Sequence, residues 1–227
     1  MIDIDWGGEQ LTVLPERALY WPRKKTLIIA DPHFGKAATF RQAGIPIPRG
    51  TTTTDLDRLR AIVRRTGAER LVVLGDFFHS RSGRQEETLA AIGSWRTEHR
   101  QLALLLVRGN HDAHAGDPPD EWNITCCDDP FREDAFWLAH HPRRKRDGHV
   151  LAGHLHPALS LDDCCGSSLR SVCFWFQPRV AVLPAFGRFT GAKSVRPSAG
   201  DRVFVVDSEA VIEIPSRIFG DRLEARG

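Results

Sequence analysis

The sequence predicts an α/β fold in which two β-sheets pack face to face and helices cover the outside of at least one sheet. In the first half of the chain, short apolar runs alternate with segments of helical periodicity. The second half consists almost entirely of short apolar runs separated by turn residues, a pattern typical of strands. Each sheet must bury an apolar face, and two stacked sheets satisfy that need together.

The predicted strands span residues 11–14, 18–21, 26–30, 71–75, 102–107, 136–140, 149–153, 172–176, 180–183, 202–206 and 211–214. The clearest helix begins near Thr54, which can serve as its N-cap, and ends at Gly67. Its apolar side chains recur on one face, at Leu56, Leu59, Ile62 and Val63. A second helix follows Arg84 and carries one apolar stripe, made by Leu89, Ile92 and Trp95.

The composition is that of an ordinary globular protein. The chain has 227 residues, of which 41% are apolar and 26% charged, and its formal net charge is +2. This balance neither demands nor excludes a nucleic-acid partner, because a local basic patch matters more than the sum. We find no internal repeat and no linker, so a single domain over residues 1–227 is expected. No apolar stretch approaches the roughly 20 residues of a membrane-spanning helix, so no membrane association is expected.

Cysteine usage and the N-terminus favour a cytoplasmic protein. The five cysteines are Cys126, Cys127, Cys164, Cys165 and Cys173. Adjacent cysteines rarely pair with each other, and no CxxC spacing suggests a zinc site. The first residues also lack the basic flank and apolar stretch of a secretory signal. Reduced thiols in the cytoplasm are therefore expected.

Polar residues gather where predicted strands end, and their types are those of a metal site. They are Asp31 and His33, then Asp76, then Asn110, His111 and Asp112, then His140 and His141, and finally His154 and His156. The carboxyl ends of strands are where open α/β sheets bind ligands. A carboxylate can bridge two cations, and imidazole and amide groups complete the shells. Two such cations support phosphoryl transfer. The mixed nitrogen and oxygen shell suits Mn²⁺, Fe or Zn²⁺.

The same residues carry a family resemblance. The motifs Asp31-x-His33, Gly75-Asp76, Gly109-Asn110-His111-Asp112, His140-x-Pro142 and Gly153-His154-x-His156 occur in the order and spacing of one superfamily. The chain thus resembles the calcineurin-like metallophosphoesterases. This resemblance implies a four-layer α/β/β/α sandwich with a dinuclear metal site at one edge.

The resemblance also implies a role for each motif residue. One metal would be held by Asp31, His33, Asp76 and His156, and the other by Asp76, Asn110, His140 and His154. His111 would protonate the leaving oxygen or stabilise the transition state, and Asp112 would fix its orientation. The His-x-Pro spacing favours His140 over His141 as the ligand, with His141 then behind it or exposed.

A closer resemblance covers nearly the whole chain. Residues 30–36, 44–48 with Gly50, 183–187, and Thr190 with Gly191 are similar to the PdeM family of bacterial phosphoesterases. That family is associated with a DNA ligase and a helicase and is described as DNA-damage-response endonucleases. It implies DNA as the substrate and Mn²⁺ as the metal. Relatives that dimerise make a homodimer possible.

Two further features leave alternatives open. Residues 75–80 resemble a stretch of SbcD-type repair nucleases, in which the histidine three positions after the bridging aspartate acts on the nucleic acid. His79 is therefore either a substrate contact or an ordinary residue at a strand end. The basic run Arg143, Arg144, Lys145 and Arg146 either grips phosphates or is a solvated loop.

Three functions are compatible with the sequence. The leading one is a dinuclear-metal phosphodiesterase or endonuclease that acts on DNA in repair. The second is a phosphatase or phosphodiesterase for a small nucleotide or a phosphoprotein, because substrate choice depends on the surface around the metals. The third is a binding scaffold that has lost activity. Because His111 and every expected ligand are present, the scaffold is the weakest of the three.

Overall fold

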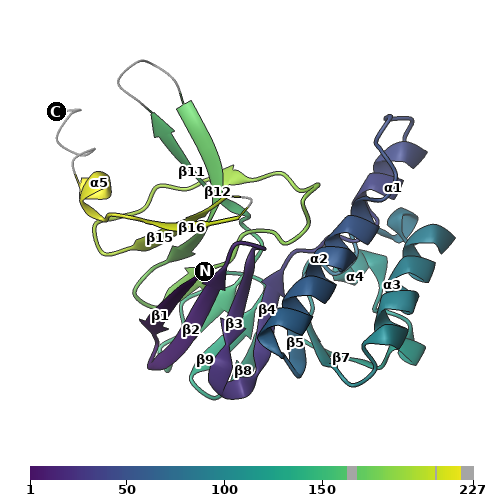
Figure 1. Cartoon of the computed structure of the whole chain (residues 1–227), viewed down its shortest axis with the longest axis horizontal. Coiled ribbons are helices and arrows are strands. Elements are labelled where there is room, and N and C mark those ends of the chain that lie inside the picture. The colour runs from purple at the N-terminus through teal and green to yellow at the C-terminus, as the bar shows by residue number, and fades with distance from the viewer. Residues whose placement is uncertain (163–167, 208, 221–227) are drawn as a thin grey trace.

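Two β-sheets pack face to face, and long helices cover the outer face of the first (Figure 1). This computed structural model describes residues 1–162, 168–207 and 209–220. Cys126, Cys127 and Cys173 are free thiols, while Cys164 and Cys165 lie outside the described residues. Within the described ranges, no helix has the length and apolarity to cross a membrane.

The first sheet follows the chain order from β1 to β7. Its strands are β1 (Ile2–Trp6), β2 (Glu9–Leu14), β3 (Ala18–Trp21), β4 (Thr26–Ala30), β5 (Arg70–Leu74), β6 (Ala103–Val107) and β7 (Ile124–Cys127). The strands β1 to β4 are antiparallel neighbours, whereas β4 to β7 run parallel. Parallel strands place their carboxyl ends at one edge of the sheet, so β4, β5 and β6 deliver their following loops to the same place.

Successive side chains of these strands serve two separate cores. In β4, Ile28 and Ala30 face the second sheet, while Leu27 and Ile29 face the helices. All four side chains are fully buried. This explains why β4 is an uninterrupted apolar run rather than an alternating one.

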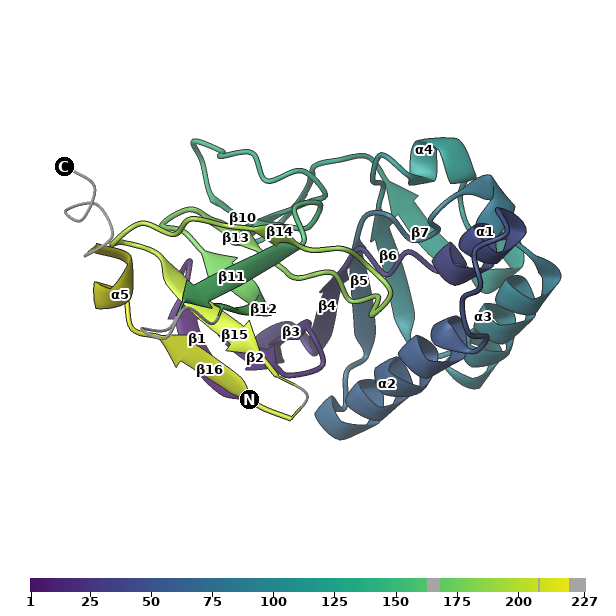
Figure 2. The same cartoon turned by 90° about the horizontal axis from the view of Figure 1, so that it is seen from above.

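The helices are α1 (Lys36–Gln42), α2 (Thr51–Thr66), α3 (Glu86–Glu98), α4 (Asp112–Ala115) and α5 (Arg217–Gly220), with 3₁₀ turns η1 (Pro22–Lys24), η2 (Arg81–Gly83) and η3 (Asp120–Trp122). Along α2 and α3 the predicted apolar faces pack on the outer face of the first sheet. Seen from above, α2 and α3 lie on one side of that sheet and the second sheet on the other (Figure 2). The N-cap of α2 is Gly50 and not Thr54, which the sequence had predicted. The helix begins one turn earlier, at Thr51, and Thr54 donates its backbone N–H to Gly50 O within that first turn. Gly67 ends the helix, as predicted.

The second sheet is mixed. Its main path is β14 (Lys193–Ser194), β11 (Pro157–Asp162), β12 (Ser168–Phe176), β13 (Val180–Val182), β10 (His149–Ala152), β9 (Phe136–Ala139) and β8 (Phe131–Glu133), and β15 (Arg202–Val206) and β16 (Val211–Ile214) branch from β12. The strands β9, β10 and β13 run parallel. The loops that follow β9 and β10 therefore leave the second sheet at one common edge.

The predicted α/β fold class is confirmed, with one refinement of its layers. Helices cover the outer face of the first sheet, but among the described residues only the four-residue α5 covers the outer face of the second, where Phe219 packs against Leu159 and Val203. The two sheets share one core, to which β1–β6 of the first sheet and β9, β10, β12, β13, β15 and β16 of the second contribute buried side chains. This shared core is consistent with a single domain over residues 1–227, which stays a prediction.

Candidate active site

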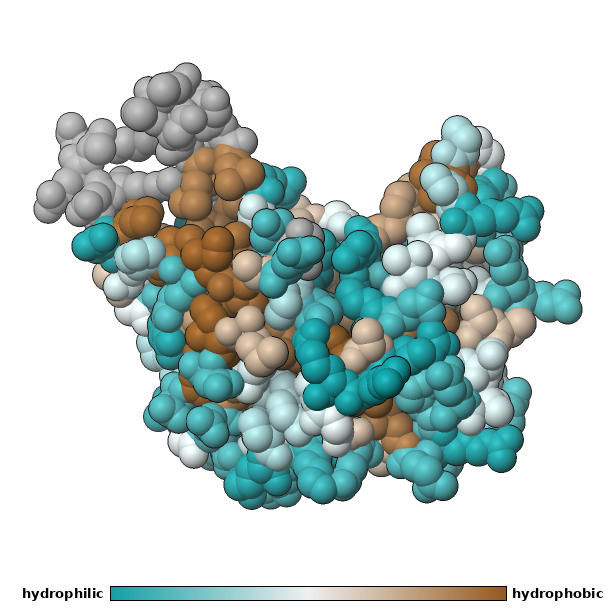
Figure 3. Space-filling view, in the orientation of Figure 1, coloured by the Kyte–Doolittle hydropathy of each residue, from teal (hydrophilic) through white to brown (hydrophobic). Residues whose placement is uncertain are grey.

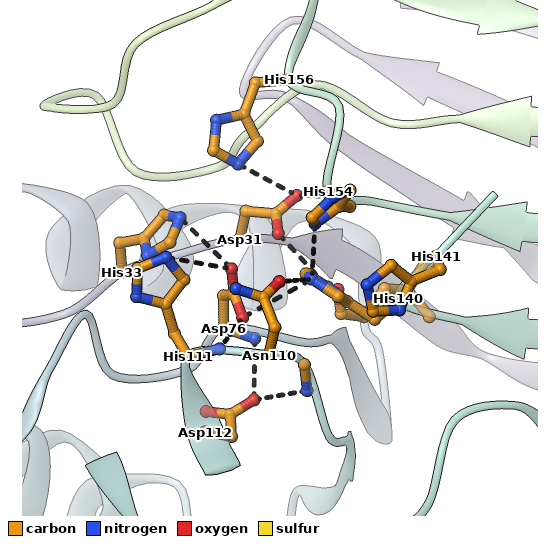
Figure 4. A network of polar contacts seen from close by, with 12 residues as sticks. Asp31, His33, Asp76, Asn110, His111, Asp112, His140, His141, His154 and His156 are labelled. Atoms are coloured by element: carbon orange, nitrogen blue, oxygen red, sulfur yellow. Dashed lines mark hydrogen bonds and ion pairs between the residues drawn. The ribbon is translucent and has the colours of Figure 1, made fainter. Parts of the chain in front are cut away.

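The polar residues after five strands meet between the two sheets (Figure 4). Loops after β4, β5 and β6 bring residues from the first sheet, and loops after β9 and β10 bring residues from the second. The bridge between Ala30 and Ala185 and the hydrogen bond from His154 N to Asp31 Oδ2, at 2.8 Å, join the two edges here. The predicted ligands Asp31, His33, Asp76, Asn110, His140, His154 and His156 are thus brought together.

The backbone around these residues is strained. Five of the site residues have φ in the left-handed region, namely Asp31, His33, Asp76, His154 and His156, with φ between 47° and 69°. Such a conformation is unfavourable for residues with a Cβ, and in folded proteins it concentrates at functional sites. These residues keep their unfavourable φ angles because the packed strands on either side fix where each loop begins and ends.

Gly75 allows the closest approach in the site. Its φ is 81°, and a Cβ at this position would meet the imidazole of His140. At Gly109, a Cβ would meet the carboxylate and backbone N of Asp76. Glycine at these points lets the loops after β5 and β6 approach the carboxylate and imidazole of the site.

We expect Gly75→Ala to destabilise the protein more than Gly8→Ala does. Gly8 has φ 83°, and a Cβ added there would meet nothing within 4 Å. Gly8→Ala should therefore lower the free energy of unfolding only by the cost of a positive φ for alanine, about 1–2 kcal/mol. Gly75→Ala adds the displacement of His140, a further loss of about 1–3 kcal/mol. Urea unfolding of both variants measures the difference, and equal losses would show that the space beside His140 is not constrained.

The carboxylate of Asp76 lies between two groups of imidazoles. Its Oδ2 is 3.6 Å from His33 Nε2, and its Oδ1 is 3.6 Å from His140 Nε2. Oδ1 also accepts a hydrogen bond from His111 N at 2.9 Å. Each oxygen therefore faces a different set of nitrogen donors, an arrangement that suits a carboxylate shared by two cations.

Around His140, several lone pairs point at one spot. His140 Nδ1 lies 3.1 Å from Leu74 O, which can only accept, so Nδ1 carries the proton and Nε2 is left with a lone pair. That nitrogen is 2.9 Å from Asn110 Oδ1 and 3.0 Å from His154 Nδ1. A nitrogen lone pair and an amide oxygen cannot bond each other directly, so a cation between them would satisfy both.

Atoms without a bonding partner also occur at the end of the site formed by Asp31 and His156. His156 Nδ1 lies 3.1 Å from Gly191 O and is protonated by the same argument, which leaves Nε2 to face Asp31 Oδ2 at 3.6 Å. The buried atoms His156 Nε2 and Asp31 Oδ1 have no hydrogen-bond partner. Buried polar atoms without partners are rare in folded proteins. The donor set therefore fits divalent cations at this end as well.

Burial sets the electrostatics of the site. It raises the pKa of Asp31 and of Asp76, and it raises the pKa of Asp112 to about 6. It lowers the pKa of His33 to about 2 and also lowers those of His140 and His154. At His156 burial also acts to lower the pKa, but contact with Asp31 outweighs it and the pKa is raised. Bound divalent cations would supply further positive charge to the buried carboxylates.

His111 lies at the edge of this group, with its side chain about one-third exposed. Its Nδ1 lies 2.6 Å from the backbone oxygen of His79, which makes Nδ1 the protonated nitrogen. Its Nε2 faces the site 3.9 Å from Asp76 Oδ2. This orientation leaves Nε2 free to exchange a proton with a substrate.

The expected role of Asp112 in orienting His111 is corrected by the structure. The carboxylate of Asp112 accepts backbone hydrogen bonds from Asp76 N and Gly109 N, both at 2.8 Å, and from Phe77 N at 2.9 Å. The ring of His111 is held by His79 O instead. Asp112 therefore fastens the loops after β5 and β6 to each other. The family resemblance implied the orienting role, but the side chain of Asp112 is taken up by these three backbone N–H groups.

His140 and His141 differ in what they face. His140 is fully buried among Asp31, Asp76 and Asn110, whereas His141 Nδ1 pairs with Asp129 Oδ2 at 2.8 Å. Asp129 also accepts the backbone N–H of His140 at 3.0 Å, so it positions both residues. Sequence reasoning missed Asp129 because nothing in its local pattern distinguishes it.

The remaining predicted residues lie around the site. The imidazole of His79 stacks on that of His111, with ring centroids 5.0 Å apart, and burial lowers its pKa to about 4. In the basic run, Lys145 lies over the Trp137 ring, while Arg143 and Arg144 are exposed just after His141. The structure thus places His79 beside the candidate metal site, while the basic run follows the loop that carries His140 and His141.

Comparison with known proteins assigns the family. The calcineurin-like phosphoesterase model matches residues 24–187, which span the loops after β4, β5, β6, β9 and β10. The chain belongs to the calcineurin-like phosphoesterase family. The family resemblance drawn from the sequence is confirmed, and this phosphoesterase is a metal-dependent enzyme.

Two solved structures resemble the phosphoesterase. The crystal structure of Pseudomonas putida nuclease MPE is 37% identical with a TM-score of 0.82, and the match covers 94% of this chain and 99% of that one. The Escherichia coli phosphoesterase Yfce is 12% identical with a TM-score of 0.42 over 83% of this chain and 97% of that one, and no argument rests on it. No curated protein matches the chain.

Proposed function

We propose that this phosphoesterase hydrolyses phosphodiester bonds in DNA, as an endonuclease that acts in DNA repair. The similar Pseudomonas putida protein is a nuclease, and the similarity extends over nearly the whole of both chains. The site supports the chemistry, since it presents two groups of metal donors that share one carboxylate.

The observation that carries the proposal is the position of Asp76. With its two oxygens 3.6 Å from His33 Nε2 and His140 Nε2, it can belong to both groups of donors at once. We assign the first cation to Asp31, His33, Asp76 and His156, and the second to Asp76, Asn110, His140 and His154. Mn²⁺ is the proposed metal, and the same shell also accepts Fe or Zn²⁺.

The side chains of this site then have separate tasks. Bound divalent cations would neutralise the charge of the phosphoryl group and lower the pKa of the attacking water. His111, with Nδ1 held by His79 O, presents Nε2 to protonate the leaving oxygen. Asp112 keeps Asp76 and Gly109 in register through their backbone N–H groups. We also propose that His79, which stacks on His111, contacts the substrate.

The cellular setting is part of the proposal. We place the enzyme in the cytoplasm, a placement supported by the free thiols of Cys126, Cys127 and Cys173. A DNA ligase and a helicase are proposed partners through the PdeM resemblance. A homodimer is also proposed, and hydrophobic surface gathers over β12, β16 and α5, where Leu169, Ile212 and Ile218 are exposed (Figure 3).

A side-by-side assay tests the substrate class. Purified enzyme is given DNA ends, loops and duplexes, a cyclic nucleotide and a phosphomonoester, each with Mn²⁺, Mg²⁺, Zn²⁺ or EDTA. We expect DNA cleavage that needs added Mn²⁺ and stops with EDTA. If DNA is the poorest substrate while the cyclic nucleotide or the phosphomonoester is turned over, the alternative function for the same site replaces the nuclease.

A further inference from the structure

A row of aromatic rings leads from the candidate metal site to the surface. The His33 ring lies 4.8 Å from that of His111 and 5.3 Å from that of His79. Beyond His79 comes Phe40, at 6.3 Å, and beyond Phe40 comes Phe189, at 5.6 Å in an edge-to-face arrangement. The last three rings come from different elements: the loop after β5, α1, and the loop that follows β13.

These outer rings are not ordinary core residues. Phe34 and Phe78, nearby in the same part of the fold, are at most 3% exposed. Phe40, His79 and Phe189 are only half-buried. Phe40 and Phe189 meet edge to face, and their partial exposure leaves aromatic surface accessible beside the site.

A cation accompanies the rings. Lys36 and Phe40 are four residues apart on α1, which places them on the same face of the helix. A small pocket among α1, α2 and the loop at 187–190, with room for about one water molecule, is lined by His33, Lys36 and Phe189 and also by the buried carboxylate of Asp55. Lys36 is half-buried, and burial lowers its pKa; its charge acts in turn on His33 and His79. One face thus offers a positive charge next to the metal donors and open rings further out.

We propose that Lys36, Phe40 and Phe189 form a nucleotide subsite, in which the two phenylalanines stack on the base next to the scissile phosphate and Lys36 contacts a phosphate. This inference rests on the proposed nuclease function and names residues for its substrate. Every base has a π-face, and stacking on aromatic side chains is the usual way to hold an exposed base without reading its sequence. A phosphoprotein or a phosphomonoester without a base has nothing to stack on such rings.

The test separates base contact from phosphate contact by binding, in EDTA so that hydrolysis plays no part. Two end-labelled oligonucleotides are compared, one with normal bases and one in which the central nucleotides are abasic. We expect Phe40→Ala and Phe189→Ala each to weaken binding of the base-bearing oligonucleotide by about tenfold, and of the abasic one by less than about twofold. Phe40→Tyr, which keeps an aromatic face, should bind like the parent.

Lys36→Met provides the complementary result. It removes a phosphate contact, so it should weaken binding of both oligonucleotides by a similar factor and reduce the salt slope by about one. With Mn²⁺ present, Phe40→Ala and Phe189→Ala should lower kcat/KM for cleavage of the base-bearing DNA more than for the abasic DNA, whereas Lys36→Met should lower both alike. If Phe40→Ala proves unstable, Phe40→Leu, which fills the space without a π-face, replaces it.

The outcomes distinguish the subsite from the nuclease function. If the parent protein cleaves DNA but the phenylalanine variants lose equally on both oligonucleotides, the subsite is wrong and the nuclease function stands. If it cleaves no DNA but binds in a base-dependent way that Phe40→Ala removes, the nuclease function is wrong and the subsite stands. A parent protein that binds both oligonucleotides equally well also overturns the subsite.

Discussion

Asp76→Asn is expected to reduce phosphodiester hydrolysis by about 10³-fold or more, equivalent to about 4 kcal/mol of transition-state stabilisation. The two oxygens of Asp76 face imidazole nitrogens of both groups of metal donors, at 3.6 Å on each side. An amide has only one oxygen and carries no charge, so it cannot be shared by two cations as a carboxylate can. The variant should therefore also bind less metal.

Metal content and turnover are measured together on the same preparation. The matched control is Asp128→Asn, since the Asp128 side chain is 94% exposed and pairs only with Arg108 among the described residues. This control should retain full activity and metal. An Asp76→Asn protein that keeps two metals per chain and normal turnover would remove Asp76 from its proposed bridging position.

His111→Ala is expected to lower kcat by about 10²–10⁴-fold while the bound metal stays unchanged. In the proposed assignment, which follows the family resemblance, His111 belongs to neither group of metal donors, and its Nδ1 is engaged by His79 O. Loss of a proton donor slows the departure of an alkoxide leaving group. It should slow a substrate with a nitrophenolate leaving group much less, because that anion leaves without protonation.

His114→Ala is the control for this prediction. His114 lies three residues further along, on α4, and its side chain is exposed, so its removal should change neither metal content nor turnover. If His111→Ala cleaves DNA as fast as the parent protein, the proposed role in leaving-group protonation is wrong. If it loses metal together with activity, His111 is a ligand instead.

Much of the fold could be predicted because each central strand is a local signal. The segments 18–21, 26–30, 202–206 and 211–214 are strands with the expected bounds. The strand β1 and the helix α1 were not predicted, each for a physical reason. In β1, Ile2, Ile4 and Trp6 alternate with aspartates, and only one side chain of the strand is buried. The acidic residues made the apolar pattern too weak to predict a strand there. The helix α1 has seven residues, too few for a periodic apolar pattern, and its packing against η2 stabilises it.

The site was predictable as a set of residue types and only partly as a geometry. Ligand-type residues stand directly after β4, β5, β6, β9 and β10, and strand direction alone brings them to one edge. The groups that orient these residues could not be predicted from the sequence. Leu74 O fixes His140 from 66 residues away, and Gly191 O fixes His156 from 35 residues away. Backbone carbonyls are present at every residue, so no sequence pattern marks the ones that matter.

By itself, the sequence determined the strands, the family and the side chains that gather at the strand ends, because these depend on local apolar runs and on residue types at fixed offsets from them. Only the tertiary structure decided that Asp112 ties two loops together, that His141 pairs with Asp129, and that Phe40 and Phe189 lie beside His79. These contacts join atoms on segments that are far apart along the chain, as Asp31 and His154 are at 123 residues. Distances between such atoms are set by the packing of the two sheets and their helices, a property of the whole core rather than of any local segment.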